Sequence, residues 1–396
     1  MAVMTSIEDL RAQFHRRVPR MFTEYVESGS WTQQTLHDNS ADFAQIRLRQ
    51  RIAVDMSDRR IATTMAGRDV AMPVALAPVG LTGMIHADGE IAAARAAEAF
   101  GVPYTLSTMS ICSIEDVAAH TSKPFWFQLY VMKDEGFVAD IMRRARAAGC
   151  DTLVLTLDLQ MLGQRHRDIK NGLSAPPKLT LPVMLDLATK WRWGKGMLGT
   201  KRRRFGNIVG HAEGVSDASS LMSWTAEQFD LQLDWAKVAR LKEQWGGKLI
   251  LKGILDVEDA RMAAKVGADA IVVSNHGGRQ LDGALSGIRM LRPIVEAVGD
   301  EVEVLMDSGI RSGQDALKAV ALGARGVFIG RAYIYGLGAM GDTGVTRALE
   351  IIRKEFDTTM ALCGERDMHD LGLHNLILPP GFTDPPGADD PKTEPA

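Results

Sequence analysis

Residues 303–330 read EVLMDSGIRSGQDALKAVALGARGVFIG, and this stretch holds one complete repeat of the pattern that decides the fold. It opens with a short apolar run, EVLM, which leads into the polar loop DSGIR. An Ala-rich amphipathic segment follows at 313–324 and ends in a Gly-Ala turn, as helices often do. A second apolar run, GVFIG, completes the stretch. The order strand, helix, strand predicts a βαβ unit whose two strands are parallel.

The same kind of apolar run recurs along the chain. The predicted strands are MPVALAP (72–78), PYTLS (103–107), FWFQLY (125–130), TLVLTLD (152–158), KLILK (248–252), AIVVSNH (270–276), EVLMDSG (303–309) and GVFIG (326–330). Continuous apolar runs are typical of strands buried on both faces, as in a parallel sheet. All intervals but one have the length of a helical crossover, so we predict an α/β fold, a (β/α)8 TIM barrel. The alternative is a two-domain Rossmann enzyme, but no G-x-G-x-x-G sequence opens a helix after the first strand.

The strand pattern also predicts how the chain is organised. A single domain covers 1–378, with the barrel at about 72–370. An N-terminal extension of helices and irregular chain precedes the first strand. The one long interval, after the fourth strand, is an insertion at about 171–246. The tail at 379–396 is rich in Pro and Asp, and we expect it to be disordered.

The composition excludes several classes of protein. With 46% hydrophobic and 24% charged residues among 396, the chain has the usage of a globular protein. A formal charge of −3 argues against a nucleic-acid binder. Cys112, Cys150 and Cys363 are too widely spaced for a disulfide framework or a zinc site, so no metal is expected. Because we find no targeting segment and no membrane-spanning run, we expect a cytoplasmic protein or one on a cytoplasmic membrane surface.

Polar side chains concentrate where the predicted strands end. In (β/α)8 barrels the catalytic groups lie at the C-terminal ends of the strands. Here those positions are occupied by Ser107, Gln128, Tyr130, Thr156, Asp158, Lys252, His276, Arg279, Asp307, Gly330 and Arg331. Any one of them alone could be structural, but the set predicts an active site.

The segment SNHGGRQLD, at 274–282, is the most specific stretch of the chain. Two glycines after His276 allow a sharp turn and a close approach of substrate. An imidazole can take a proton near neutral pH, and Arg279 can hold a carboxylate through two parallel hydrogen bonds. We therefore expect a base and an anion-binding group in one loop.

The last two strands end in DSGIR (307–311) and GR (330–331). This is where such barrels commonly bind phosphate with loop amides and a short helix. Two arginines there indicate a ligand that carries a phosphate. Lys252, at the end of the fifth strand, is either a Schiff-base nucleophile or a fixed cation beside a cofactor.

SNHGGRQLD, DSGIR and GRA together resemble the FMN-dependent 2-hydroxy-acid dehydrogenase and oxidase family over about 1–378, most of all its bacterial respiratory L-lactate dehydrogenases. The resemblance implies FMN as the cofactor. The residues it assigns to the flavin ring system are Ala77, Pro78, Val79, Ser107, Gln128 and Thr156, with Lys252 and Ser274 also on the cofactor side. Those it assigns to the phosphate are Asp307, Gly309, Arg311, Gly330 and Arg331.

The resemblance also implies the substrate set, which is Tyr25, Tyr130, Arg165, His276 and Arg279. His276, Asp158, Tyr130 and Arg279 form the implied catalytic group. In this scheme His276 removes a proton and Asp158 stabilises the resulting imidazolium, while the choice between hydride and carbanion transfer stays open. A homotetramer is implied as well.

Two positions bear on the reaction, Gly80 on the electron acceptor and Met109 on the substrate, since Met109 argues against glycolate. Gly80 stands where oxidases of the family have Ala, and Met109 stands where glycolate oxidases have Trp. We therefore expect oxidation of L-lactate or a close (S)-2-hydroxy acid to the 2-oxo acid, with electrons passed to a quinone of the respiratory chain. The alternatives are a soluble oxidase or lactate monooxygenase that uses O2, a mandelate-type dehydrogenase, and a flavin-free lyase or aldolase that uses Lys252.

The insertion contains a basic segment, 178–204, with eight Lys and Arg residues against Asp186. Leu, Met and Trp residues are interleaved with the basic ones. Such a mixture is typical of a segment that lies in an anionic membrane interface. We predict peripheral contact with the cytoplasmic side of the inner membrane; the alternative is a solvated loop.

Overall fold

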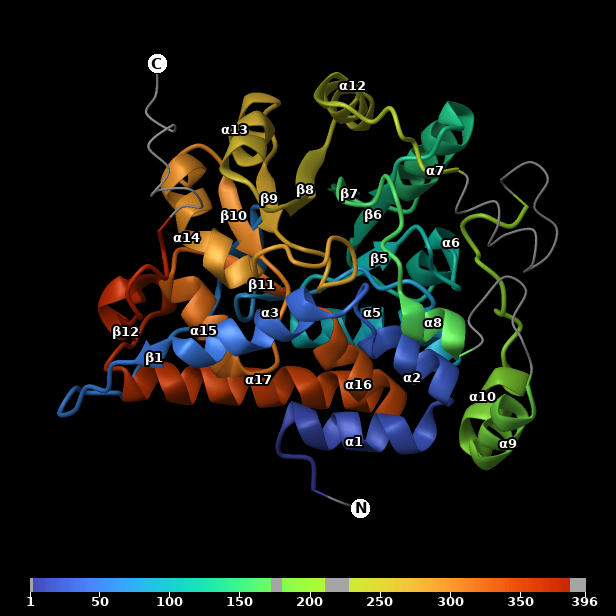
Figure 1. Ribbon diagram of the computed structural model, residues 1–396, viewed down its shortest axis with the longest axis horizontal. Coiled ribbons are helices and arrows are strands. Elements are labelled where there is room, and N and C mark those ends of the chain that lie inside the picture. The colour runs from blue at the N-terminus through green and yellow to red at the C-terminus, as the bar shows by residue number, and fades with distance from the viewer. Residues whose placement is uncertain (1–2, 172–179, 211–227, 385–396) are drawn as a thin grey trace.

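The structure, a computed structural model, describes residues 3–171, 180–210 and 228–384 (Figure 1). Eight parallel strands curl into a barrel surrounded by helices, which confirms the predicted (β/α)8 fold. The strands are β4 (Val74–Leu76), β5 (Thr105–Ser107), β6 (Trp126–Tyr130), β7 (Thr152–Thr156), β8 (Lys248–Ile254), β9 (Ala270–Val273), β10 (Glu303–Met306) and β11 (Gly326–Ile329). Every one overlaps an apolar run of the sequence.

Strands that are neighbours in the chain are neighbours in the barrel, from β5 to β11, and β11 pairs with β4. Between β4 and β5 the contact narrows to the bridge Leu76–Tyr104, where the Leu76 amide donates to the Pro103 carbonyl at 2.8 Å. The barrel is therefore nearly closed. Because all eight strands run in the same direction, their C-terminal ends meet at one rim.

Apolar side chains fill the interior of the barrel. Trp126 and Phe328 pack there with ring centroids 5.8 Å apart. The hairpin of β2 (Thr63–Met65) and β3 (Arg68–Val70) adds Met65 and Val70 to the same cluster. Since the interior is packed, a ligand can enter only at a rim.

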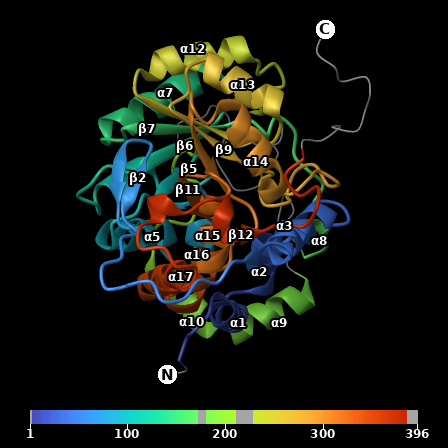
Figure 2. The same ribbon diagram turned by 90° about the vertical axis from the view of Figure 1, so that its left-hand side faces the viewer.

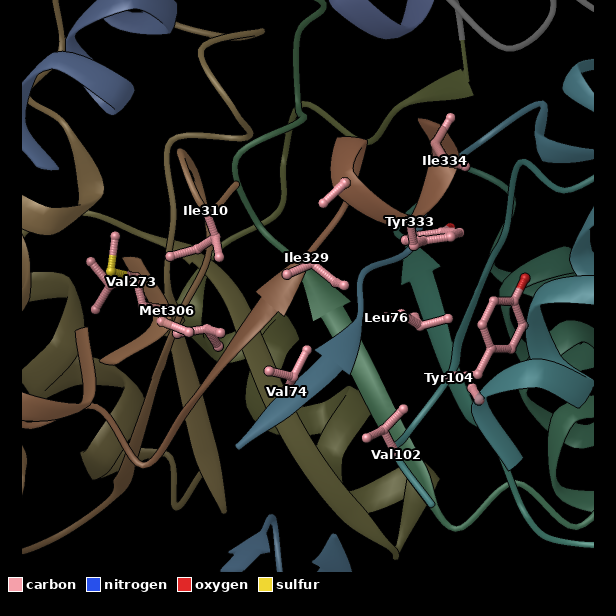
Figure 3. Close-up of a cluster of buried hydrophobic side chains, with 14 of the residues drawn as sticks. Val74, Leu76, Val102, Tyr104, Val273, Met306, Ile310, Ile329, Tyr333 and Ile334 are labelled. Carbon is pink, nitrogen blue, oxygen red and sulfur yellow. The ribbon is translucent and has the colours of Figure 1, made fainter. Parts of the chain in front are cut away.

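A second apolar cluster lies between the strands and the surrounding helices. Figure 3 shows part of it, where Val74, Leu76 and Ile329 of the strands lie near Tyr333 of α16. The helices that follow the strands are α4 (Thr82–Ile85), α5 (Gly89–Phe100), α6 (Ile114–Ala118), α7 (Glu135–Ala147), α12 (Trp235–Trp245), α13 (Val257–Lys265), α14 (Gly287–Val298), α15 (Gly313–Ala321), α16 (Arg331–Met340) and α17 (Asp342–Leu362).

The N-terminal extension forms α1 (Ile7–Arg17), α2 (Arg20–Glu27), α3 (Gln34–Gln45) and β1 (Arg47–Leu48). Helix α1 lies beside α16 and α17, as both views show (Figures 1 and 2). After the helical turns η1 (Met368–Asp370) and η2 (Leu373–Asn375), β12 (Leu376–Ile377) pairs with β1. Phe382 is buried beneath the Arg289 guanidinium, whereas 385–396 lie outside the described residues.

The insertion is described in two parts, since 172–179 and 211–227 lie outside the described residues. Helix α8 (His166–Lys170) precedes the insertion and contacts α2. The insertion's helices α9 (Leu181–Thr189) and α10 (Trp191–Gly199) lie at one edge of the molecule (Figure 1). The Trp193 indole donates to the Met84 carbonyl at 2.8 Å, and Arg202 pairs with Asp116 at 2.7 Å. Among the described residues no helix is long and apolar enough to cross a membrane.

Candidate active site

A cavity of about 480 Å³ opens at the C-terminal rim of the barrel. Most of the predicted site residues line it, although they come from distant parts of the chain. Those in its wall are Tyr25, Ala77, Pro78, Val79, Tyr130, Arg165, Lys252, His276, Arg279, Asp307, Gly309, Arg311, Gly330 and Arg331. The structure thus brings the expected flavin, phosphate and substrate residues together in one place.

The remaining predicted residues are Ser107, Gln128, Thr156, Asp158 and Ser274, and they support this wall. The Ser107 hydroxyl donates to Gln128 Oε1 at 3.0 Å. Thr156 pairs with Lys252 in the sheet, and Lys252 Nζ donates to the Ser274 hydroxyl at 3.0 Å. Asp158 contacts the wall through His276.

The HGG sequence after β9 shapes the turn that presents His276. His276, Gly277 and Gly278 have φ values of 57°, 66° and 71°, all in the left-handed region. A Cβ at position 278 would lie 2.5 Å from the Cα of Leu36, so this glycine also lets the N-terminal extension pack on the loop. The imidazole is thereby turned toward the cavity.

His276 and Asp158 form a partly buried pair, with Nδ1 of the imidazole 2.9 Å from Oδ1 of the carboxylate. On the other side of the ring, Nε2 lies 3.5 Å from the Tyr130 hydroxyl. Burial would raise the pKa of Asp158, but His276 and Lys252 outweigh it and the pKa is lowered. The carboxylate of Asp158 therefore stays charged beside the imidazole.

Lys252 is a buried cation with defined partners. Its Nζ lies 3.0 Å from Oδ2 of Asp307 as well as from the Ser274 hydroxyl. Burial would lower the pKa of Lys252, yet Asp307 and Asp158 raise it above its ordinary value. A Schiff-base lysine needs a neutral amine, so this environment favours the fixed-cation interpretation.

Arg279 and Arg165 flank the ring of Tyr25. Their Cζ atoms lie 4.8 and 6.0 Å from the centroid of that ring. Nη1 of Arg279 donates to the carbonyls of Tyr25 and Ser28 at 2.6 and 2.9 Å, which holds the guanidinium between α2 and the barrel. Burial and the nearby Arg165 lower the pKa of Arg279, so an anion placed between the two arginines would relieve their repulsion.

Positive charge also gathers at the ends of β10 and β11. Arg331 donates to the carbonyls of Val26 and Gly277 at 2.7 and 3.0 Å. Burial and the charges of Arg311 and Arg279 lower the pKa of Arg331 to about 9. Within the described ranges neither Arg311 nor Arg331 forms an ion pair. This arrangement fits a bound phosphate.

The features that FMN would need are present in the described part of the chain. Gln128 Nε2 and Thr156 Oγ1 are buried and have no hydrogen-bond partner there, so they are free to bond to a flavin ring. Gly330 lines the cavity next to the phosphate arginines, and a Cβ there would lie in ordinary van der Waals contact with Ala77 and Val79, at 3.8 and 3.9 Å. The residues present therefore fit FMN.

Several residues in or beside the cavity wall belong to no sequence motif that would predict their place in the site. Asp168 pairs with Arg165 at 3.4 Å and accepts from the Ser28 hydroxyl at 2.7 Å, so it orients the anion site. Phe205 and Phe229 enter the wall from the insertion. Their aromatic side chains were the one feature of the sequence that could have suggested a role in the site. The sequence around them does not indicate that the insertion returns to the rim of the barrel. Within the described residues no cluster of His, Cys, Asp or Glu could hold a metal ion.

The chain is similar to known proteins over almost its whole length. A family model described as FMN-dependent dehydrogenase matches residues 14–377. The L-lactate dehydrogenase of Caulobacter vibrioides (strain NA1000 / CB15N) is 47% identical over 370 residues, which are 92% of this chain and 96% of that protein. The L-lactate dehydrogenase of Pseudomonas aeruginosa (strain LESB58) is 44% identical over 378 residues, 95% of this chain and 98% of its own.

Among solved structures, that of the monotopic membrane protein (S)-mandelate dehydrogenase aligns with a TM-score of 0.91 at 35% identity. The alignment covers 96% of this chain and 100% of that one. The fold, the cavity and the matched family model lead to one conclusion. This chain belongs to the FMN-dependent dehydrogenase family.

Proposed function

We propose that this protein oxidises L-lactate, or a close (S)-2-hydroxy acid, to the corresponding 2-oxo acid with FMN as its cofactor. The observation that carries the proposal is that His276, paired with Asp158 at 2.9 Å, lines the same cavity as Arg279, Arg165 and Tyr25. A hydroxy acid needs a base for its hydroxyl and cations for its carboxylate, and this cavity offers both. Relatives named L-lactate dehydrogenase support lactate as the substrate.

The substrate carboxylate would bind between Arg279 and Arg165, with the Tyr25 hydroxyl as a further donor. Arg279 is held by two carbonyls and Arg165 by Asp168, so neither guanidinium has to be ordered when substrate arrives. Both arginines are therefore positioned before binding. We propose that this clamp fixes the substrate hydroxyl next to His276 and Tyr130.

His276 would take the hydroxyl proton at Nε2, since Nδ1 is engaged with Asp158. The charged carboxylate of Asp158 would stabilise the imidazolium that forms. Burial raises the pKa of Tyr130 above its ordinary value, so its hydroxyl stays protonated and can donate a hydrogen bond to the substrate oxygen. These residues bind, orient and deprotonate the substrate.

The same proposal assigns the cofactor residues. Ala77, Pro78, Val79, Ser107, Gln128 and Thr156 would hold the flavin ring, with Lys252 and Ser274 beside it, and Asp307, Gly309, Arg311, Gly330 and Arg331 would hold the phosphate. When bound, FMN supplies the two-electron acceptor that no side chain provides. Lys252, a buried cation, would favour negative charge developing next to it.

A quinone is the proposed final acceptor, which requires that the protein works at a membrane surface. Supporting observations are the exposed apolar side chains on α9 and α10, namely Leu181, Met184, Leu185, Trp191 and Leu198. Exposed basic residues lie among and just after them, namely Arg192, Lys195, Lys201, Arg203 and Arg204. Lys178 belongs to the same basic segment but lies outside the described residues. Apolar and basic groups on one short segment suit an anionic lipid surface, which we place on the cytoplasmic side of the inner membrane.

Mandelate is a second candidate substrate because the (S)-mandelate dehydrogenase structure aligns so closely. To decide, the purified protein is mixed anaerobically with L-lactate, (S)-mandelate and larger 2-hydroxy acids while the flavin absorbance is followed. Reduction by L-lactate at the highest kcat/KM supports the proposal, and failure of L-lactate to bleach the flavin overturns it. Repeating turnover with O2 and with a quinone analogue tests the acceptor, and light scattering tests the proposed homotetramer.

A further inference from the structure

Phe229, on the part of the insertion that returns to the barrel, contacts one of the proposed proton-transfer residues. Its ring meets the Tyr130 ring edge-on, with centroids 5.7 Å apart and an interplanar angle of 87°. Tyr130 in turn lies against His276, with ring centroids 6.5 Å apart. Phe229 is only 4% exposed, yet it forms part of the cavity wall. One side of the cavity is therefore closed by a ring that the barrel itself does not supply.

The backbone at Phe229 is fixed independently of its side chain. Residues Met132 and Phe229 form an isolated antiparallel bridge, so the returning insertion adds a short strand segment beside the end of β6. The Lys133 amide donates to the Gln228 carbonyl at 2.8 Å, and the Asp230 amide donates to the Val131 carbonyl at 3.1 Å. Asp230 is also held by Lys237 at 2.7 Å. A change of the Phe229 side chain would therefore leave this backbone in place.

The cavity wall divides into a polar and an apolar part. The arginines and Tyr25 would take the substrate carboxylate, and His276 with Tyr130 would take the hydroxyl. The third substituent of a 2-hydroxy acid, its side chain, is left to the apolar part. The apolar residues of the wall that are not assigned to the flavin or the phosphate include Met109, Leu159, Leu162, Phe205 and Phe229.

We propose that Phe229 is a specificity-determining residue that limits the substrate side chain to a short aliphatic group. This inference rests on the proposed function. The ring lines the cavity beside Tyr130, the residue proposed to bond to the reacting hydroxyl, and an aryl group on the substrate would compete with it for the same volume. A methyl group, as in lactate, needs no such volume. The preference for short substrates therefore comes from the insertion.

The test compares Phe229→Ala and Phe229→Leu with the wild type as holoenzymes. The measured quantity is the ratio of kcat/KM for (S)-mandelate to kcat/KM for L-lactate, from anaerobic flavin reduction. Removing a ring from an apolar pocket should raise this ratio at least ~10-fold in the alanine variant and by less in the leucine variant. Leu231→Ala is the matched control, because Leu231 is on the same returning segment and 60% exposed; its ratio should stay at the wild-type value.

The ratio separates specificity from support of Tyr130. If Phe229 only braces Tyr130, both substrates lose activity equally and the ratio does not change, which would overturn the proposal. A second readout is the ratio of dissociation constants for phenylglyoxylate and pyruvate, measured from the flavin spectrum without turnover. If the wild type fails to oxidise L-lactate, the proposed function is wrong, but this binding ratio still tests Phe229. If the Phe229→Ala variant has full FMN content and an unchanged binding ratio, Phe229 does not determine the substrate specificity.

Discussion

The side-chain amides of Asn39 and Asn275 exchange two hydrogen bonds. Nδ2 of Asn39 donates to Oδ1 of Asn275 at 2.9 Å, and Nδ2 of Asn275 donates to Oδ1 of Asn39 at 2.7 Å. Both residues are buried, and Oδ1 of Asn275 also accepts from the Gly278 amide at 3.0 Å. Asn39 belongs to α3, whereas Asn275 immediately precedes His276. The N-terminal extension therefore holds the loop that carries the proposed base.

This pair predicts the effect of Asn39→Leu. The substitution removes both hydrogen bonds between the two buried side chains, although Asn275 keeps its bonds to the Gly278 amide and the Leu285 carbonyl. The loss of two buried hydrogen bonds should lower the free energy of unfolding by ~1–3 kcal/mol. It should also lower kcat/KM for the hydroxy acid, because the loop with His276 and Arg279 loses its brace. Thermal unfolding and steady-state kinetics measure the two effects. Ser40→Ala, at the exposed neighbouring position of α3, is the control. Lower stability with unchanged kinetics would show that the pair does not position the loop.

His276→Gln tests the proposed base. Glutamine keeps a polar side chain at the position but cannot take a proton, so FMN should stay bound while its reduction by substrate slows. The expected loss is at least ~10²-fold, the size typical of general-base catalysis. Anaerobic stopped-flow absorbance measures the reduction rate, and the flavin spectrum measures cofactor content. A rate of flavin reduction near that of the wild type would show that His276 is not the base.

Asp158→Asn should give a stability difference with a defined pH dependence. His276 and Lys252 lower the pKa of Asp158 below its ordinary 3.8 despite burial. A carboxyl whose folded-state pKa is depressed stabilises the fold above its unfolded pKa, and this contribution disappears as the pH falls through the folded value. Wild type should thus be more stable than the variant from neutral pH down to about 4, and the two should converge below that. Urea unfolding across this range measures the difference; a gap that widens with acid contradicts the assigned charge state.

Arg311→Ala should weaken the retention of FMN. A charge-assisted hydrogen bond is worth ~1.5–3 kcal/mol, which corresponds to a rise in Kd of ~10- to 150-fold. Arg325→Ala is the matched control, since Arg325 is exposed and lies directly before β11, at the opposite end of the barrel from the cavity. Fluorescence titration of the apoprotein with FMN measures both variants. Equal FMN affinity in Arg311→Ala and wild type would place the phosphate elsewhere.

The sequence predicted those features that depend on local pattern. Apolar runs identified the strands because a strand that is buried on both faces accepts few residues other than apolar ones. The barrel fold then predicts that residues as distant in the chain as Ala77 and Arg331 lie at one rim, and both line the cavity. Phe229 and Asp168 could not be predicted in the same way. The position of Phe229 depends on how the irregular insertion returns to the barrel, and that of Asp168 depends on its contacts with Ser28 and Arg165. Scattered contacts of this kind, such as the Met132–Phe229 bridge, have no periodicity in the sequence. The Asn39–Asn275 pair depends likewise on packing between segments far apart in the chain.

The exposed apolar residues of α9 and α10 allow the membrane proposal to be tested without unfolding the insertion. Lys190 donates to the His15 carbonyl at 3.0 Å, and Trp193 and Arg202 also bind the body of the protein, so these three should be left unchanged. Replacing the outward-facing set with Ser should instead remove only the groups that would enter lipid. That set is Leu181, Met184, Leu185, Trp191 and Leu198.

We expect the fivefold variant to lose its sedimentation with anionic vesicles while its flavin is still reduced by substrate at the wild-type rate. Quinone reduction in vesicles should fall with binding, because a quinone dissolved in lipid is reached only from the surface. Basic residues near an anionic surface contribute ~1 kcal/mol each, so wild-type binding should weaken as salt rises. Ser replacements at Leu362 and Leu373, which are 57% and 42% exposed elsewhere on the molecule, are the control and should bind vesicles as the wild type does. If the fivefold variant still sediments with vesicles at low salt, α9 and α10 do not form the lipid contact.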